Sequence, residues 1–226
     1  MMILRDRTSP EISEFLRYLA LHPEAETNLP TLNKLSREIG ISIAGLREQL
    51  EVARALGLVD VRPRTGTRRL PYSFSPAVKQ SLTYALTLNQ EHFQKYSELR
   101  THIENAFWDE AVALLADEDK SELQNIISTA FEKLRGHPIQ VPHEEHRRLH
   151  LLIYSRLDNP FVTGLLEAYW DAYESVGLNM YAGGVDYLET VWGYHKTMVE
   201  SICNGNYAAG RKALVAHIDL FAQRPS

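Results

Sequence analysis

Four of the nine histidines in the sequence are placed where their imidazoles could bind one metal ion. His146 and His150 are four residues apart, so they share one face of a helix that contains them. His195 and His217 each stand in the middle of an apolar stretch. Imidazoles that converge from separate helices suit a divalent transition metal such as zinc or nickel. The same pattern also fits hydrogen-bonded core histidines, or an exposed pair on a charged helix, so spacing alone leaves these alternatives open.

Helices must position these histidines, and the second part of the sequence predicts little else. Apolar residues recur there at helical spacing, and alternating strand patterns are absent. Ser121 and Glu122 are expected to cap and begin the third helix. We predict an antiparallel all-α helix bundle over residues 76–226, with helices over residues 78–88, 90–115, 121–134, 143–157, 160–175, 186–204 and 207–223.

Residues 1–72 predict a winged helix-turn-helix, a DNA-binding unit whose second helix enters the major groove. A first helix is expected to start at Ser9-Pro10-Glu11, and the linker to the bundle at residues 70–76. Gly40 separates the next two helices and Gly57 ends the second of them. The predicted elements are helices from Ser9 to His22, from 30 to 39 and from 42 to 56, a strand over 58–61, a turn over 62–67 and a strand over 68–70.

Two apolar stripes predict how these helices pack. The first helix is expected to turn Ile12, Phe15, Leu16, Leu19 and Ala20 inward. The helix that begins at Ser42 is expected to bury Leu46, Leu50, Val52, Ala53 and Leu56.

Charge separates the two parts of the chain. Residues 30–70 hold eight Lys or Arg against four acids, a net +4 in a chain of net −5. Cations gathered on a helix and a hairpin are what phosphate neutralisation needs. The alternative is an ordinary solvated helix pair with a hairpin. Residues 76–226 carry a net −7, so this part would avoid DNA and suits sensing or dimerisation.

Composition and targeting signals indicate a cytoplasmic location. The chain is 44% hydrophobic and 23% charged, as in ordinary soluble proteins. No run of about 18 apolar residues predicts a membrane span, and the first twelve residues lack the features of a signal peptide. A single cysteine, Cys203, excludes an internal disulfide. We therefore expect a cytoplasmic protein that does not bind a membrane.

The segments "LSREIGIS" and "GLREQLEVARALGLV", with the hairpin Gly66 after them, resemble the DNA-binding domain of the GntR family of bacterial transcription regulators. The resemblance implies that Ser42, Arg47 and Gly66 meet DNA. Two positions depart from the family pattern, because Ile43 and Asn33 stand where family members usually have arginine. The full predicted DNA-binding set is Lys34, Arg37, Ser42, Arg47, Arg64, Thr65, Gly66 and Thr67.

Residues 92–222 resemble the FCD effector domain of the FadR branch of that family. The residues that carry the likeness are Tyr96-Ser97-Glu98-Leu99-Arg100, Glu104, Leu149-His150, Asn159-Pro160, His195 and His217. The resemblance implies a metal held by one Asp and three His, and an organic carboxylate beside it. His146 takes the place of the Asp, so the predicted ligands are His146, His150, His195 and His217, or the last three alone with His146 turned away. Arg100 and Asn159 are the predicted effector-binding residues. Arg100 also fits a surface ion pair with Glu98 or Glu104, and Asn159 also fits a helix start.

The sequence therefore predicts a homodimeric, ligand-responsive transcription regulator and not an enzyme. It would bind double-stranded operator DNA, a small organic acid and a divalent transition metal. Two alternatives remain: a metal-dependent helical hydrolase, which three histidines and an open coordination position would allow, and a regulator whose metal is purely structural.

Overall fold

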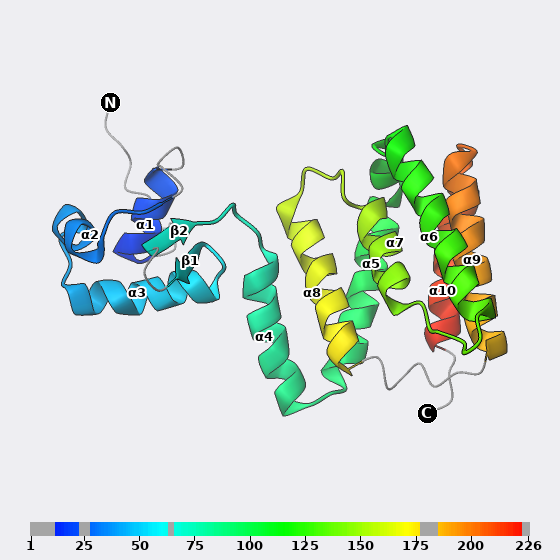
Figure 1. The fold of residues 1–226 in the computed structure, drawn as a ribbon, viewed down its shortest axis with the longest axis horizontal. Helices are drawn as coiled ribbons and strands as arrows, with labels where there is room; N and C mark the ends of the chain where they lie inside the picture. The colour runs from blue at the N-terminus through cyan, green and yellow to red at the C-terminus, as the bar shows by residue number, and fades with distance from the viewer. Residues whose placement is uncertain (1–11, 23–27, 63–65, 177–184, 223–226) are drawn as a thin grey trace. The chain divides into compact units, whose positions relative to one another are not determined.

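The computed structural model describes residues 12–22, 28–62, 66–176 and 185–222, with the backbone alone described for 185 and 218–222. The chain divides into two compact units, residues 1–77 and 78–226, and each unit has its own hydrophobic core. The predicted fold class, a mainly α chain with an N-terminal winged helix-turn-helix and an all-α second part, is confirmed (Figure 1).

Within its described residues, the N-terminal unit contains three helices and a two-stranded antiparallel sheet. The helices are α1 (Glu14–Leu21), α2 (Leu32–Ile39) and α3 (Ile43–Ala55), and the strands are β1 (Val59–Arg62) and β2 (Gly66–Arg69). Val59 pairs with Arg69 and Arg62 pairs with Gly66. The prediction put the turn at 62–67, but Arg62, Gly66 and Thr67 belong to the strands, and residues 63–65 lie outside the described residues.

Hydroxyl side chains begin each of the three helices. The Ser13 Oγ accepts from the Leu16 amide, the Thr31 Oγ1 from Lys34 and the Ser42 Oγ from Gly45, so each cap satisfies a first-turn N–H that the helix cannot. Gly40 ends α2 in the left-handed conformation, with a φ of 80°. The tight link between α2 and α3 therefore follows from local sequence.

The first helix differs from its prediction. Its described part begins at Glu14, after the Ser13 cap, whereas the predicted start at Ser9-Pro10-Glu11 lies outside the described residues. Phe15 and Leu19 are buried, but Ile12 and Ala20 are exposed. A helix of eight residues makes only about two turns, so only about two of its side chains can point into the core. The residues at the two ends of the predicted stripe therefore stay in solvent. Val52 in α3 is likewise exposed.

The second unit is a bundle of seven helices within the described residues. They are α4 (Ser75–Leu88), α5 (His92–Ala113), α6 (Asp117–Arg135), α7 (His143–Ile153), α8 (Pro160–Val176), α9 (Val185–Cys203) and α10 (Tyr207–Ala222). The helix α9 packs against α6 and α10, while α5 packs against α8 and α10 and α7 against α6 and α8. These pairings bring α5, α7, α9 and α10 around one interior (Figure 1).

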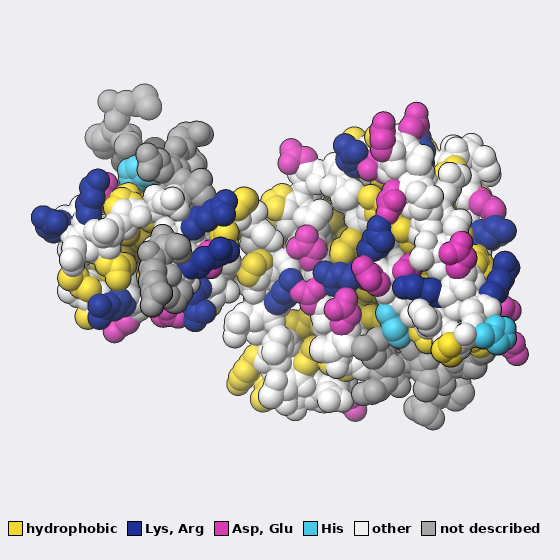
Figure 2. All heavy atoms as spheres, viewed as in Figure 1, with side chains coloured by type: hydrophobic (Ala, Val, Ile, Leu, Met, Phe, Trp, Pro, Cys, Tyr) yellow, Lys and Arg dark blue, Asp and Glu magenta, His cyan; other side chains and the backbone are white. Residues whose placement is uncertain are grey.

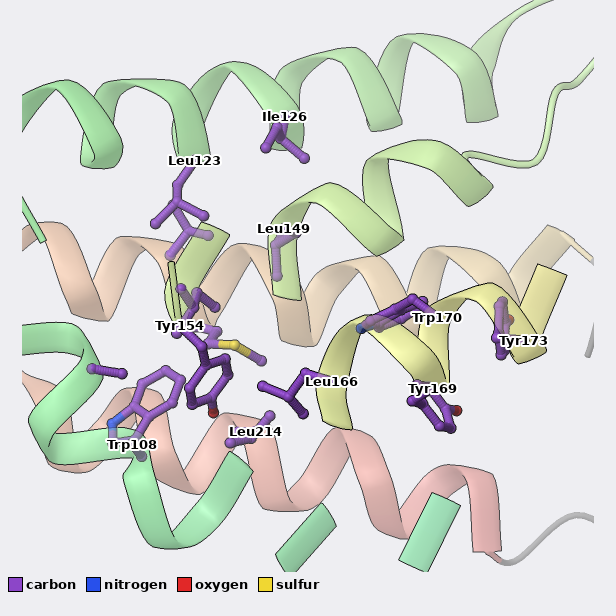
Figure 3. Packing of buried hydrophobic residues seen from close by; sticks show 14 of the residues in the cluster. Trp108, Leu123, Ile126, Leu149, Tyr154, Leu166, Tyr169, Trp170, Tyr173 and Leu214 are labelled. Carbon is purple, nitrogen blue, oxygen red and sulfur yellow. The ribbon is translucent and has the colours of Figure 1, made fainter. Parts of the chain in front are cut away.

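Large aromatic side chains fill this interior. Trp108, Tyr154 and Trp170 are each at most 1% exposed, and Figure 3 shows them among leucines from neighbouring helices. The Trp108 indole donates to the Tyr207 carbonyl at 2.9 Å. A Cβ on Gly210 would lie 2.8 Å from the Trp108 ring, so the absence of a side chain there lets α10 approach α5.

Three helix ends lie three or four residues from their predicted positions. Helix α4 begins at Ser75 and not at residue 78, so it includes the last two residues of the predicted linker. Helix α6 begins at Asp117 and not at Ser121, because the Asp119 carboxylate accepts from the Ala116 amide at 2.8 Å and caps the helix earlier. Helix α7 ends at Ile153 and not at residue 157, since Tyr154 already leaves the helical conformation. Within the described part of the chain, no helix is both long and apolar enough to cross a bilayer.

Candidate metal centre and nucleic-acid interface

The four predicted metal ligands lie together inside the helical unit. His146 and His150 come from α7, His195 from α9 and His217 from α10. Each offers one ligand atom, and these four atoms all lie within 4.8 Å of one another. In a tetrahedral site, bonds of about 2.0–2.1 Å put two ligand atoms about 3.4 Å apart. Small side-chain rotations would therefore let one ion contact all four rings.

The four rings are buried and neutral at pH 7. Their exposed fractions are 5% or less. Burial lowers the pKa of His146, His195 and His217 well below the ordinary value, and the positive charge of Arg100 lowers these pKa values further. Burial also lowers the pKa of His150, against the opposing effect of Glu104. A metal needs the neutral imidazole, so this set is ready to bind one without releasing protons.

Glu104 is a residue of the site that the prediction did not include. It lies on α5 with no exposed surface, and its Oε1 is 3.0 Å from the His150 Nδ1. The same His150 Nδ1 lies 2.9 Å from the Arg100 Nη2, and a guanidinium nitrogen can only donate, as a carboxylate can only accept. We assign the proton to Nδ1, as the donor to Glu104, because the Arg100 Nη2 has the Glu104 Oε2 as its own partner at 2.9 Å. The His150 Nε2, which lies 3.2 Å from the His195 Nε2, then keeps its lone pair for a metal. A carboxylate behind a ligating histidine is common in metal sites.

Arg100 pairs with Glu104 from one turn earlier in α5. Its Nη2 lies 2.9 Å from the Glu104 Oε2, and its guanidinium covers the Tyr169 and Trp170 rings at 4.7 and 4.8 Å. Burial alone would raise the pKa of Glu104, but Arg100 and His150 lower it to about 2. Arg100 is only 7% exposed, so its ion pair is buried and not the surface pair that the sequence also allowed.

Two buried donors next to the histidines lack acceptors among the described residues. They are the Arg100 Nε and the Trp170 indole nitrogen. The centroid of the Trp170 ring lies 4.7 Å from that of the His146 ring and 5.1 Å from that of the His150 ring. A buried N–H without an acceptor is unfavourable by about 1–3 kcal/mol. An acceptor supplied by a ligand would remove that penalty.

The other predicted site residues of this unit have structural partners. The Asn159 Oδ1 accepts from the amides of Phe161 and Val162, both at 3.2 Å, which makes Asn159 the cap of α8. Its part in effector binding stays a prediction. Glu145, the nearest carboxylate in sequence to His146, pairs with the Lys133 ammonium at 2.6 Å and so is committed to α6.

The candidate nucleic-acid interface lies on α2, on the N-terminal half of α3 and on the hairpin. Lys34, Arg37, Ser42 and Arg47 are all exposed, and Lys and Arg side chains are spread over the surface of this unit (Figure 2). No hydrogen bond or ion pair of the Arg47 side chain is found within the described ranges. Arg47 is therefore available to an outside partner.

The hairpin adds backbone and small residues to this interface. Gly66 has a φ of 89°, and a Cβ there would meet no atom within 4 Å. The Thr67 carbonyl accepts from the Leu29 amide at 2.8 Å, which ties β2 to the start of α2. Arg64 and Thr65 lie outside the described residues.

Four of the basic residues counted from the sequence have internal partners. The Arg37 Nε donates to the Asn33 carbonyl within α2 at 3.1 Å. Arg54 pairs with Glu51 and Arg62 with Asp60, each at 2.6 Å. The Arg69 Nη1 donates to the Leu19 carbonyl at 2.8 Å and thereby joins β2 to α1. Among the described residues of this unit, the positive charge offered to a partner therefore centres on four exposed cations, Lys34, Arg37, Arg47 and Arg68.

Comparison with known proteins identifies the second unit. The model of the FCD domain matches residues 96–220, more than half of the chain. The chain is a GntR-family regulator with an FCD domain. A curated relative from Escherichia coli K12, the uncharacterized HTH-type transcriptional regulator YieP, is 25% identical over 202 residues, which cover 85% of this chain and 84% of the relative.

Solved structures share the fold of this regulator. The Streptococcus agalactiae GntR structure superposes with a TM-score of 0.69 at 17% identity and covers 93% of this chain and 97% of that one. The E. coli McbR/YncC structure gives a TM-score of 0.50 at 16% identity over 93% and 95% of the two chains.

Proposed function

We propose that this GntR-family regulator binds operator DNA as a homodimer and that its FCD domain adjusts that binding when a metal and a small organic acid occupy it. Its place of action is the cytoplasm. The observation that carries the proposal is the buried set of four histidines in the domain that follows a winged helix-turn-helix. A closed two-fold dimer presents two α3 helices to a two-fold-symmetric operator.

The metal part of the proposal rests on ligand type. His146, His150, His195 and His217 would hold the ion, and a set of four neutral nitrogens favours zinc, nickel or copper over magnesium and calcium. A bound divalent ion would supply positive charge and a coordination position for an anion. Glu104 would hold the His150 ring in place through Nδ1, while Trp170 packs against the His146 edge.

The effector part rests on charge and on donors. The four imidazoles are neutral and the charges of Arg100 and Glu104 cancel, so a divalent ion leaves a net charge of about +2 in a buried site. A carboxylate reduces that charge, and its oxygens can accept from the Arg100 Nε and the Trp170 indole, which lack acceptors among the described residues. Both features favour an organic acid over a neutral ligand.

Regulation needs a difference between two states. The effector changes operator affinity only if it binds one arrangement of the dimer more tightly than the other. A coupling free energy of about 1–3 kcal/mol, or about 5- to 150-fold in affinity, suffices.

A gel-shift titration tests the DNA part of the proposal. DNA from the promoter beside the regulator's own coding sequence is titrated at several salt concentrations with wild type, Arg47→Ala and Lys95→Ala. Lys95 is an exposed cation of the FCD domain and controls for the loss of one positive charge. We expect wild type and Lys95→Ala to bind alike and Arg47→Ala to bind about 5- to 150-fold more weakly. Wild type without sequence-specific, salt-sensitive binding would refute the proposal.

Thermal unfolding tests the effector part. The zinc-loaded protein is melted with each member of a panel of carboxylic acids, because a ligand of the folded state raises the melting temperature by mass action. The variant Trp170→Phe keeps the aromatic ring but removes the N–H. We expect it to retain zinc and to lose part of the stabilisation by the acid. If no acid stabilises the zinc-loaded protein, the metal is structural.

A further inference from the structure

The tip of α3 presents apolar groups where a recognition helix usually reads bases. Ile43 is the first residue of the helix and 38% exposed, and Ala44 beside it is exposed as well. The N-terminal residues of the second helix in a helix-turn-helix contact base edges. Neither of these side chains can donate or accept a hydrogen bond, so this tip cannot read a base by hydrogen bonds from Ile43 or Ala44.

The polar residues of the helix stand around this tip. The Ser42 Oγ already accepts from the Gly45 amide at 3.1 Å. Arg47 lies one turn further along, and the exposed acids Glu48 and Glu51 follow. The acids repel phosphates, so the half of α3 nearer to Ser42 is the part that can enter a groove.

Gly45 has no internal explanation in this structure. It lies inside the first turn of α3 with an ordinary backbone conformation, and a Cβ there would meet only the Ser42 Oγ, at a normal contact distance of 3.4 Å. Glycine within a helix is less favourable than alanine by about 1 kcal/mol. A glycine that the fold does not need is typical of a place where another molecule comes close to the backbone.

We propose that Ile43 and Ala44 specify thymine in each operator half-site by contact with its C5-methyl group, and that Gly45 lets the helix approach closely enough for this contact. In the major groove the methyl group distinguishes a T·A pair from the other pairs, and apolar side chains recognise it. This inference rests on the proposed DNA binding. It adds which base is read and which side chains read it.

Replacement of thymine by deoxyuridine isolates the methyl group. The operator is first selected from a random-sequence library with the full-length wild-type chain. Each thymine is then replaced in turn by deoxyuridine, which keeps base pairing and removes only the methyl. We expect at least one position in each half-site where the replacement weakens binding about four-fold, the equivalent of one buried methyl group. Replacement in both half-sites should weaken binding about 15-fold.

Variants assign the effect to side chains. Ile43→Ala should bind the thymine operator more weakly and lose the discrimination against deoxyuridine at that position. Val52→Ala is the matched control, because Val52 is 50% exposed on the same helix but two turns further on, and it should keep the discrimination. Gly45→Ala should melt at or above the wild-type temperature and yet bind the operator more weakly.

The outcomes separate this inference from the proposed function. If library selection recovers no operator, the DNA-binding proposal itself fails. If an operator is recovered and no thymine is sensitive to deoxyuridine, thymine recognition by α3 is refuted. It is also refuted if Ile43→Ala keeps the same sensitivity, and the close approach is refuted if Gly45→Ala binds as tightly as wild type.

Discussion

Replacing Glu104 by glutamine should destabilise the FCD domain strongly although the side chain keeps its size. The change removes the carboxylate that faces the buried guanidinium of Arg100 and the His150 ring. Arg100 stays charged in a site where it is only 7% exposed. Removing one partner of a buried ion pair is strongly unfavourable for this reason.

The size of the effect follows from the ionisation of Glu104. Its pKa falls from an ordinary 4.5 to about 2 in the folded chain. At about 1.4 kcal/mol per pKa unit, the folded state favours the carboxylate by about 3 kcal/mol, near the about 3–5 kcal/mol known for such substitutions. For a unit of this size the melting temperature should fall by about 6–12 °C.

Circular dichroism with a chelator present measures this fall without a contribution from metal. Glu98→Gln is the matched control, because Glu98 is an exposed glutamate of the same helix, and its melting temperature should change by about 1 °C or less. The double variant Arg100→Met with Glu104→Gln removes both charges and should melt higher than Glu104→Gln alone.

Two results would contradict this reasoning. Glu104→Gln could melt within about 2 °C of wild type, which would mean that the pair contributes little to stability. The double variant could instead melt lower than Glu104→Gln alone, which would assign the loss to packing and not to an unpaired charge.

With zinc present, Glu104→Gln should also bind the metal about 10- to 100-fold more weakly, because the His150 ring loses its carboxylate partner.

Two further predictions concern stability and pH. The metal-free protein should lose stability as the pH falls below about 6.5. Burial lowers the pKa of the four histidines in the folded state, whereas the unfolded chain takes up protons at the ordinary histidine pKa. Urea unfolding with chelator at pH 7.5 and 5.5 measures this loss, and equal stability at the two pH values would contradict it. Gly210→Ala should lower the free energy of unfolding by about 1–3 kcal/mol, since the new Cβ would lie 2.8 Å from the Trp108 ring. Gly193→Ala is the control and should not destabilise the protein, because a Cβ there meets no atom within 4 Å. Equal shifts in melting temperature for the two variants would refute the steric argument.

The architecture was predictable because local sequence signals agree with the tertiary fold. The turn between α2 and α3 was predicted from Gly40, which follows one apolar stripe, and from Ser42, which precedes the next. In the structure Gly40 is left-handed and Ser42 caps α3. The helix ends were less predictable. The start of α6 depends on Asp119 reaching back to the Ala116 amide, which competes with the serine cap that the sequence offers four residues later.

The histidine cluster was predicted from spacing and resemblance, and the structure places its four rings together. Glu104 and Trp170 were not predicted as members of the site. The i, i+4 spacing of Arg100 and Glu104 predicted a possible ion pair, but one helix gives no sign of whether such a pair faces solvent or the interior. Trp170 carries no spacing signal of its own, and its contact with His146 depends on how α7 packs against α8.

Metal analysis of the purified chain tests the central claim most directly. The chain is stripped with chelator, incubated with zinc or nickel and dialysed, and the bound metal is counted by mass spectrometry. Wild type is compared with His195→Ala and with the control His102→Ala, because His102 lies outside the cluster. We predict one ion per chain for wild type and His102→Ala and much less for His195→Ala. Wild type that retains no metal, or His195→Ala that retains as much as wild type, would contradict a metal centre built from these four histidines.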